Sequence, residues 1–257
     1  MLCRDDIERF ARVCRDVTAT PLPSDRAYEG EIGTYNEKRM HMILKRFVCE
    51  DESTHEIPVG KRYIADILCD GEIYEIQTGS LLPLKKKLEY YIENTDYHVT
   101  VVHPVAVEKR KIWIDTESGE SQPTRKSRGS VQDETAELVY ISELIASGRV
   151  SVWLLLIGEE EYRFLDGWSR DKKRGSNRYE RLPTEIFDEI ALNATEDYAV
   201  LLPDGLPECF TAAEYAKAAK QRMGRRVYMA LAALTNVGVL ENAPKRGRAS
   251  VWKRRTY

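Results

Sequence analysis

The apolar residues of this chain change from a helical to a strand period over short segments. Apolar side chains three and four positions apart predict an amphipathic helix over residues 34–47. Residues 62–69 and 72–77 predict two strands, because Asp-Gly between alternating runs is a strong signal for a two-residue hairpin. A helix over 81–94 and a strand over 97–107 follow. The predicted order is therefore helix, two or three strands, helix and strand.

Segments outside this run follow the same rules, with proline and glycine marking their ends. These segments are a helix over 5–17, a hairpin from 111–115 and 120–123, a helix over 136–146, a hairpin from 150–157 and 162–165, and a helix over 183–192.

Charge is distributed unevenly along the 257 residues, although the net charge is only -3. Residues 209–257 carry 11 Lys/Arg against 2 Asp/Glu, a net of +9, whereas residues 1–208 carry 28 against 40, a net of -12. An acidic body with a basic end suggests a polyanion partner. The acidic link around Asp204-Gly205 predicts a boundary, so we expect two domains over 1–205 and 206–257.

Several classes of protein are excluded by composition and motifs. No run reaches the roughly 18 apolar residues that a membrane-spanning helix needs, and the charged N-terminal segment is unlike a signal peptide. The five cysteines form no C-x-x-C pair, which argues against a structural zinc site. We therefore expect a protein of the reducing cytoplasm without a membrane partner.

The predicted hairpin places two carboxylates opposite each other. With a two-residue loop, Cys69 pairs with Glu72, and Asp66 then falls opposite Glu75. Like charges so placed, with Cβ atoms roughly 4.5–5.5 Å apart, destabilise a sheet. A divalent cation such as Mg²⁺ would compensate this pair. A basic side chain such as Arg62 is an alternative, and two acids on a solvated face are another.

A third acid, Glu37, belongs to the apolar stripe of the predicted 34–47 helix, three residues before Met40. An unpaired acid on a core-facing stripe is costly, so Glu37 needs a partner. It either joins the carboxylate pair or completes a capping box with Thr34 at the start of the helix. The two roles can coexist.

An acid on a helix, then Ile64-Ala65-Asp66 and Glu75-Ile76-Gln77 on a hairpin, then a helix and a strand, resemble the PD-(D/E)XK nuclease superfamily. The resemblance covers about residues 34–107. It implies an α/β fold with a restriction-endonuclease-like αβββαβ core, extended by residues 108–205. It also implies an endonuclease dependent on Mg²⁺ or Mn²⁺. The implied metal ligands are Asp66, Glu75, the Ile76 carbonyl and Glu37.

Two positions depart from the superfamily pattern. Ala65 stands at the position of the name-giving proline, which varies widely in the superfamily. Gln77 stands at the lysine position, as it does in some restriction endonucleases of the superfamily. Gln77 can orient a water molecule as donor and acceptor, but it cannot supply positive charge. Lys85 or Lys86 of the next helix would supply this charge, unless both lie on a solvated helix face.

The basic end of the chain has the pattern helix, turn, helix and hairpin over residues 210–253. Thr211 and Glu214 form a capping box before a helix over 212–219, and Gly238 ends a second helix that starts at residue 225. This pattern resembles a small winged helix-turn-helix domain, which implies a recognition helix in a DNA groove and a basic wing on the backbone. The implied nucleic-acid contacts are Arg222, Arg225, Arg226, Lys245, Arg246, Arg248 and Lys253.

These features predict a metal-dependent nuclease that hydrolyses phosphodiester bonds in DNA and is positioned by a winged helix. The resemblance implies double-stranded DNA as the partner and leaves a homodimer open. Basic segments over 125–128 and 170–181 would extend the DNA-binding surface. Two alternatives stay open: a DNA-binding regulator whose nuclease fold is inactive because of Gln77, and an RNA-processing nuclease.

Overall fold

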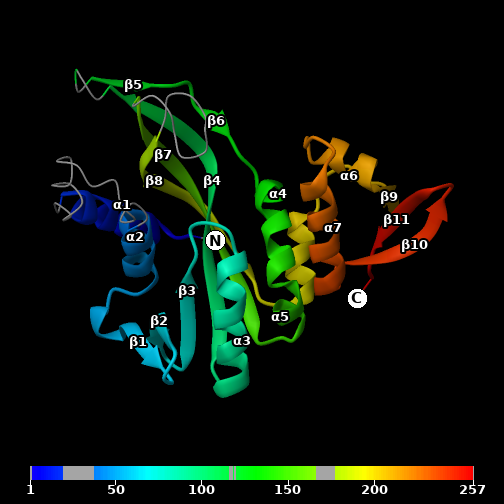
Figure 1. Cartoon of the computed structure of the whole chain (residues 1–257), viewed down its shortest axis with the longest axis horizontal. Helices are drawn as coiled ribbons and strands as arrows, with labels where there is room; N and C mark the ends of the chain where they lie inside the picture. The colour runs from blue at the N-terminus through cyan, green and yellow to red at the C-terminus, as the bar shows by residue number, and fades with distance from the viewer. Residues whose placement is uncertain (1, 20–37, 116–117, 119, 166–176, 257) are drawn as a thin grey trace. The chain divides into compact units, whose positions relative to one another are not determined.

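The computed structural model describes residues 2–19, 38–115, 118, 120–165 and 177–256 (Figure 1). These residues form a mixed α/β structure with several helices and an eight-stranded sheet, whose main path has the order β1-β2-β3-β4-β7-β8. The short strands β5 and β6 pair with β4. The strands of this sheet are β1 (His55–Val59), β2 (Tyr63–Cys69), β3 (Glu72–Ile76), β4 (His98–Ile114), β5 (Ser121–Pro123), β6 (Ser127–Arg128), β7 (Val150–Phe164) and β8 (Asn177–Leu192).

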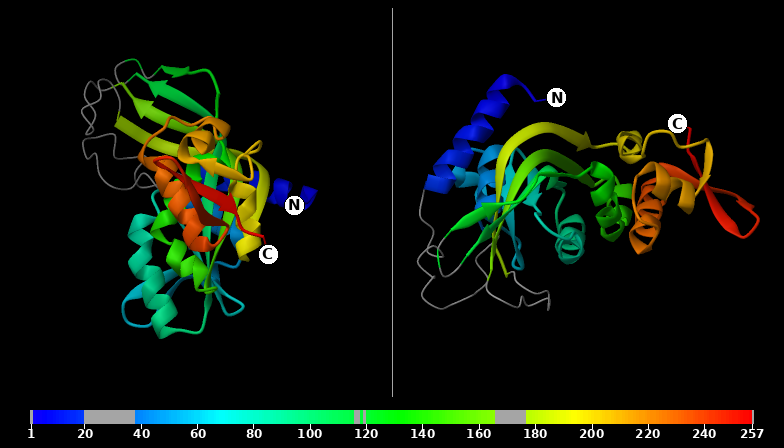
Figure 2. Two further views of the ribbon diagram at one scale, coloured as in Figure 1. Left: turned by 90° about the vertical axis from the view of Figure 1, so that its right-hand side faces the viewer. Right: turned by 90° about the horizontal axis from the view of Figure 1, so that it is seen from above.

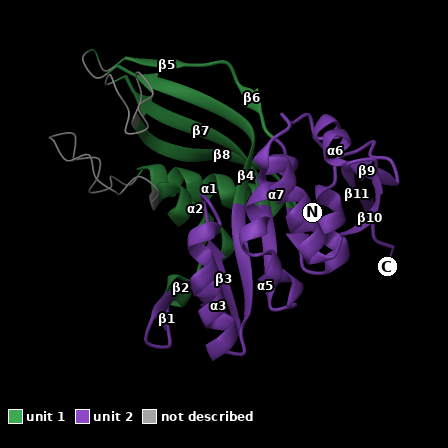
Figure 3. Cartoon of the chain, turned by 45° about the vertical axis from the view of Figure 1, so that its right-hand side comes forward, with its two compact units in different colours: residues 1–55, 104–129, 155–189 green, residues 56–103, 130–154, 190–257 purple. Residues whose placement is uncertain are grey.

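The chain divides into two compact units (Figure 3). One unit contains residues 1–55, 104–129 and 155–189, and the other contains 56–103, 130–154 and 190–257. Each unit is thus built from segments that are far apart in the sequence. The boundary expected at residue 205 does not coincide with this division, so it stays a prediction.

The Asp70-Gly71 hairpin has the predicted register. Cys69 pairs with Glu72, and the antiparallel ladder of β2 and β3 continues to Ile67 and Tyr74. Both turn residues have a positive φ, 51° at Asp70 and 79° at Gly71. This combination defines the two-residue turn whose twist matches that of the flanking strands. The local sequence signal therefore sets the alignment of the two strands.

The helix α3 (Lys85–Asn94) connects β3 to the parallel strand β4. It follows the short 3-10 helix η3 (Leu82–Leu84), in which Pro83 lies in the first turn, where its missing N–H costs nothing. Leu88 and Tyr91 are fully buried on one face of α3. The element order from α2 (Lys38–Val48) to β4 agrees with the predicted order, and the start of the predicted 34–47 helix lies outside the described residues.

The basic end forms the helices α6 (Ala212–Ala218) and α7 (Arg225–Val237) and a three-stranded sheet of order β10-β11-β9. Thr211 and Glu214 cap α6 as predicted, and Gly238, with a φ of 100°, ends α7. Figure 2 shows the hairpin in red, extending from the orange helix α7. The strands are β9 (Cys209–Thr211), β10 (Leu240–Arg246) and β11 (Ala249–Arg254).

Two predictions in the middle of the chain are wrong. The residues of the predicted 150–165 hairpin form one strand up to Phe164, because the acids between its two predicted arms are paired within the strand layer. Lys109 Nζ lies 2.7 Å from Glu159 and 3.3 Å from Glu161. Residues 183–192 belong to the strand β8 instead of a helix. Ile186 and Ile190 have helical spacing, but pairing with β7 decides the backbone conformation.

The remaining helical segments include α1 (Arg4–Ala19), which confirms the helix predicted over 5–17. Residues predicted as the 136–146 helix form the later part of an interrupted helical series over 131–146. This series consists of α4 (Val131–Glu134), the 3-10 helix η4 (Thr135–Tyr140) and α5 (Ser142–Ala146). None of the helices in the described part of the chain has the length and apolar content needed to cross a membrane.

Candidate functional site

Asp66 lies where the strands β2 and β3 stop pairing. Continued in the same register, the ladder would pair Ile76 with Ala65. Instead, the amide of Ile76 donates to Asp66 Oδ2 at 2.8 Å. The carboxylate therefore takes the place of a strand carbonyl, and it is fixed beside the residue that follows Glu75.

Glu75 is a buried carboxylate on β3, with an exposed fraction of 2%. Tyr91 Oη donates to Glu75 Oε1 at 3.0 Å, and Lys87 Nζ lies 2.5 Å from Glu75 Oε2. Burial and, to a smaller extent, the nearby Asp66 charge raise the pKa of Glu75 to about 7, against the opposing effects of Lys87 and Tyr91. The site thus contains two carboxylates whose negative charges repel each other, and one cation, Lys87, beside Glu75.

Burial and the neighbouring Glu75 raise the pKa of Tyr91, and the charge of Asp66 adds to this shift. Tyr91 therefore keeps its proton and remains a hydrogen-bond donor. The charge of Asp66 therefore lies near both Glu75 and Tyr91. The ladder ends one pair before the predicted Asp66–Glu75 pair, so the direct opposition of these residues stays a prediction.

The α3 lysine that forms an ion pair with Glu75 is Lys87, and the charge-supplying role expected of Lys85 stays a prediction. Lys85 Nζ lies 3.8 Å from Glu89 and 4.0 Å from Glu143. Residues two apart on a helix point about 200° away from each other, so both lysines cannot serve one site. Lys87 shares its face with Tyr91, four residues later. This four-residue spacing from Tyr91 is the feature of the sequence that points to Lys87.

Arg62 was the other predicted compensating cation. Its guanidinium lies 5.3 Å from the centre of the Tyr63 ring. Lys87 instead forms the ion pair with Glu75. Tyr63 also makes an edge contact with Tyr91, at 6.2 Å between ring centres, so aromatic side chains enclose this end of α3.

Gln77 shapes the turn that follows β3. Its side-chain Nε2 donates to the Ser80 carbonyl at 2.5 Å. Its own carbonyl lies 2.6 Å from His103 Nδ1, which must be the donor because a carbonyl only accepts. Pro104, the next residue on β4, has no N–H for the continuing ladder. A water-orienting role for Gln77 stays a prediction, and its donor nitrogen is engaged within the turn.

The other two predicted metal ligands are Glu37 and the Ile76 carbonyl. Glu37 lies outside the described residues, and so does its proposed capping box with Thr34. Ile76 is buried next to Glu75, and its amide binds Asp66. Within the part of the chain that is described, no three His, Cys, Asp or Glu side chains gather as a metal-ligand group. The described site therefore consists of two carboxylates, Lys87 and Tyr91.

The predicted nucleic-acid contacts fall into two sets. Arg246 Nη1 lies 2.9 Å from Glu214, and Lys253 Nζ lies 2.8 Å from Glu241. Arg226 donates to the Asp133 carbonyl, and its Nη1 lies 3.4 Å from Glu137. The sequence could not separate these three from the rest, because their partners are 12 or more positions away. The residues exposed to solvent in the other set are Arg222, Arg225, Lys245 and Arg248.

The two further basic segments are described only in part. Lys126, between Arg125 and Arg128, forms an ion pair with Glu108. Residues 170–176 lie outside the described residues, and Arg181 is directed to Glu159, with Nη1 at 3.5 Å. The predicted extension of the DNA-binding surface by these segments stays a prediction.

Comparisons with known proteins identify relatives but no activity. A family model described as a domain of unknown function (DUF8091) matches residues 38–193. The chain is also similar to an uncharacterized protein of Treponema pallidum (strain Nichols), with 27% identity over 229 residues, which is 87% of each chain. No solved structure matches the chain. The family match includes Asp66, Glu75 and Lys87, and it ends before α6.

Proposed function

The chain belongs to the family described as a domain of unknown function (DUF8091), and we propose from its own residues that it is a metal-dependent nuclease acting on DNA. The observation that carries the proposal is the group of Asp66, Glu75 and Lys87 at the fork of β2 and β3. The helix, three strands, helix and strand from α2 to β4, with the sheet order β1-β2-β3-β4, support a PD-(D/E)XK-type core.

The donor set fits a hard divalent cation. Mg²⁺ prefers a small number of carboxylate oxygens together with water and substrate phosphate. The charge of Asp66 raises the pKa of the buried Glu75, and a cation beside the two carboxylates would relieve this repulsion. Asp66, Glu75 and the Ile76 carbonyl would hold Mg²⁺ or Mn²⁺, with Glu37 as a further ligand. The bound cation would polarise the scissile phosphate and lower the pKa of a water molecule.

The protein side chains have separate tasks in this proposal. Lys87 supplies the positive charge that Gln77 cannot supply, and it is placed to offset charge that develops on the phosphate. Tyr91 donates to Glu75 and fixes the rotamer of that carboxylate. The Ile76 amide does the same for Asp66. Both acids are thus oriented before a substrate binds, which is the condition for efficient electrostatic catalysis.

The basic end of the chain is proposed to hold the DNA as a winged helix. Its net charge of +9 favours a polyanion, because neutralising phosphates releases counterions. The helix, turn, helix and hairpin order of α6, α7, β10 and β11 supports this assignment. Arg222 and Arg225 at the start of α7, with Lys245 and Arg248 at the hairpin tip, are the exposed contacts.

Cleavage of plasmid and linear duplex DNA, with and without Mg²⁺ or Mn²⁺, tests the proposed function. We expect Asp66→Ala and Glu75→Ala to lower the rate at least about 100-fold, because each removes a preorganised charge. Glu143→Ala is the matched control, since this acid is on α5 and 77% of its side chain is exposed.

Two outcomes of this assay would overturn the proposal. DNA binding without cleavage under any metal condition, unchanged in both variants, would favour the regulator. Metal-dependent cleavage of RNA in place of DNA would favour an RNA-processing nuclease.

A further inference from the structure

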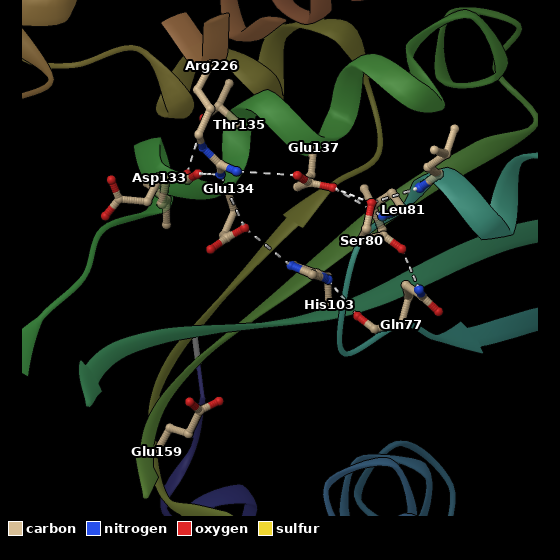
Figure 4. A network of polar contacts seen from close by, with 12 residues as sticks. Gln77, Ser80, Leu81, His103, Asp133, Glu134, Thr135, Glu137, Glu159 and Arg226 are labelled. Atoms are coloured by element: carbon tan, nitrogen blue, oxygen red, sulfur yellow. Dashed lines mark hydrogen bonds and ion pairs between the residues drawn. The ribbon is translucent and has the colours of Figure 1, made fainter. Parts of the chain in front are cut away.

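A single carboxylate joins the turn after β3 to the helix α7 (Figure 4). Glu137 of η4 accepts hydrogen bonds at Oε2 from Ser80 Oγ, at 2.8 Å, and from the Leu81 amide, at 3.4 Å. Its other oxygen, Oε1, lies 3.4 Å from Arg226 Nη1. Only 14% of the Glu137 side chain is exposed. The two oxygens therefore serve two different parts of the same compact unit.

The helix α7 is held along its length by the segment that carries Glu137. Arg226 donates to the Asp133 carbonyl near the start of α7. Gln221, in the preceding turn, donates to the Gln132 carbonyl at 2.8 Å. At the other end, Asn236 Nδ2 donates to Ser142 Oγ at 3.0 Å. A shift of α7 would therefore be transmitted to the segment 132–142.

The turn on the other side of Glu137 leads directly into α3. Ser80 and Leu81 precede η3 and α3. The Ser80 hydroxyl and the Leu81 amide donate to Glu137, which therefore acts as a helix cap supplied from another segment. The same turn is bound by Gln77 through the Ser80 carbonyl. Lys87 follows within the first turn of α3. The position of Lys87 thus depends on where this turn is fixed.

We propose that Glu137 is a positioning residue, which is held by Arg226 and which fixes the turn 77–81 and the start of α3. It thereby couples the helix α7 to the Lys87–Glu75 pair. The consequence for catalysis rests on the proposed function, whereas the coupling is a property of the protein alone. Arg226 and its neighbour Arg225 accordingly have different tasks: Arg226 supports the site, and Arg225 faces nucleic acid.

Hydrogen exchange of the metal-free protein without nucleic acid tests the coupling. In Glu137→Ala and Arg226→Ala, exchange in peptides covering residues 77–88 is expected to rise about three- to tenfold, as for loss of one or two hydrogen bonds. The control Arg225→Ala, at the neighbouring position on α7, should leave these peptides unchanged. Glu137→Gln keeps an acceptor for Ser80 and Leu81 but turns a donor toward Arg226, so exchange should rise as in Arg226→Ala and less than in Glu137→Ala.

The exchange rates distinguish a local loss of protection at residues 77–88 from a general loss of stability. Unchanged exchange at 77–88 in Arg226→Ala and Glu137→Ala would overturn the coupling. A uniform rise over the whole chain would also overturn it, because it indicates general destabilisation. Arg226 is 54% exposed, so Arg226→Ala should keep its fold even where Glu137→Ala does not.

Cleavage kinetics provide the second readout. Arg226→Ala should lower kcat about three- to tenfold with little change in KM, since it acts through the position of Lys87. Arg225→Ala should instead raise KM, because it removes a phosphate contact. A KM effect alone for Arg226→Ala would assign it to DNA binding and overturn the positioning role. Absence of cleavage by the wild type would refute the proposed function and leave the exchange experiment to decide the coupling.

Discussion

Replacement of Lys87 by methionine is expected to lower kcat for DNA cleavage about 100- to 1000-fold, which is typical for loss of one preorganised charge in an active site. Methionine keeps the length of the apolar chain and removes only the ammonium group that lies 2.5 Å from Glu75. Lys85→Met and Lys86→Met are the matched controls on the same helix, because Lys85 faces Glu89 and Lys86 is exposed. Single-turnover rates with excess protein measure the chemical step for each variant.

The pH profile distinguishes catalysis from simple misfolding in the Lys87 variant. Lys87 lowers the pKa of Glu75, so its removal should raise that pKa and move the acidic limb of the rate profile to higher pH. An equal loss of rate in all three lysine variants would contradict the assignment of Lys87. A cleaving Lys87→Met protein with an unchanged pH profile would also contradict it.

Glu75 is expected to make the metal-free protein less stable as the pH rises from about 4.5 to about 7. The folded-state pKa is raised, so in this interval the folded state holds a proton that the unfolded state has released. The stabilising contribution is therefore fully present below pH 4.5 and is lost as the pH passes the folded value. The shift corresponds to about 3 kcal/mol at most.

Urea unfolding in EDTA at pH 5 and pH 8 measures this effect. Glu75→Gln is the variant for comparison, because glutamine still accepts the hydrogen bond from Tyr91 but does not titrate. The wild type should lose up to about 3 kcal/mol more than the variant between the two pH values. The difference between the two proteins isolates Glu75 from all other titrating groups. Identical pH dependences of the unfolding free energy in the two proteins would contradict this prediction, because they would mean that folding does not raise the pKa of Glu75.

Features encoded by neighbouring residues could be predicted from the sequence. The Asp70-Gly71 turn defines its own backbone angles, and the register of β2 and β3 then follows by counting. The capping box of Thr211 and Glu214 is likewise local, and both residues occupy the predicted cap. The same register places Asp66 and Glu75 just beyond the end of the ladder, whereas the hydrogen bond from the Ile76 amide to Asp66 does not follow from it.

Features that depend on distant residues could not be predicted in the same way. Selection of Lys87 over Lys85 depends on the rotation of α3 against the sheet, which the three consecutive lysines do not reveal. In the sequence Arg226 cannot be distinguished from its neighbour Arg225, because its partner Glu137 is 89 positions away. The strand β8 was predicted as a helix because its apolar spacing is ambiguous without β7.

The central claim is that Asp66 and Glu75 form a divalent-cation site, and titration with Mn²⁺ followed by electron paramagnetic resonance tests it most directly. The free-ion signal of Mn²⁺ falls when the ion binds, so the measurement needs no substrate. At pH 8, which is above the pKa of Glu75, the wild type should bind Mn²⁺, and Asp66→Asn and Glu75→Gln should each lose this binding while remaining folded. Mn²⁺ binding that is equal in the wild type and both variants, or absent from all three, would contradict the account.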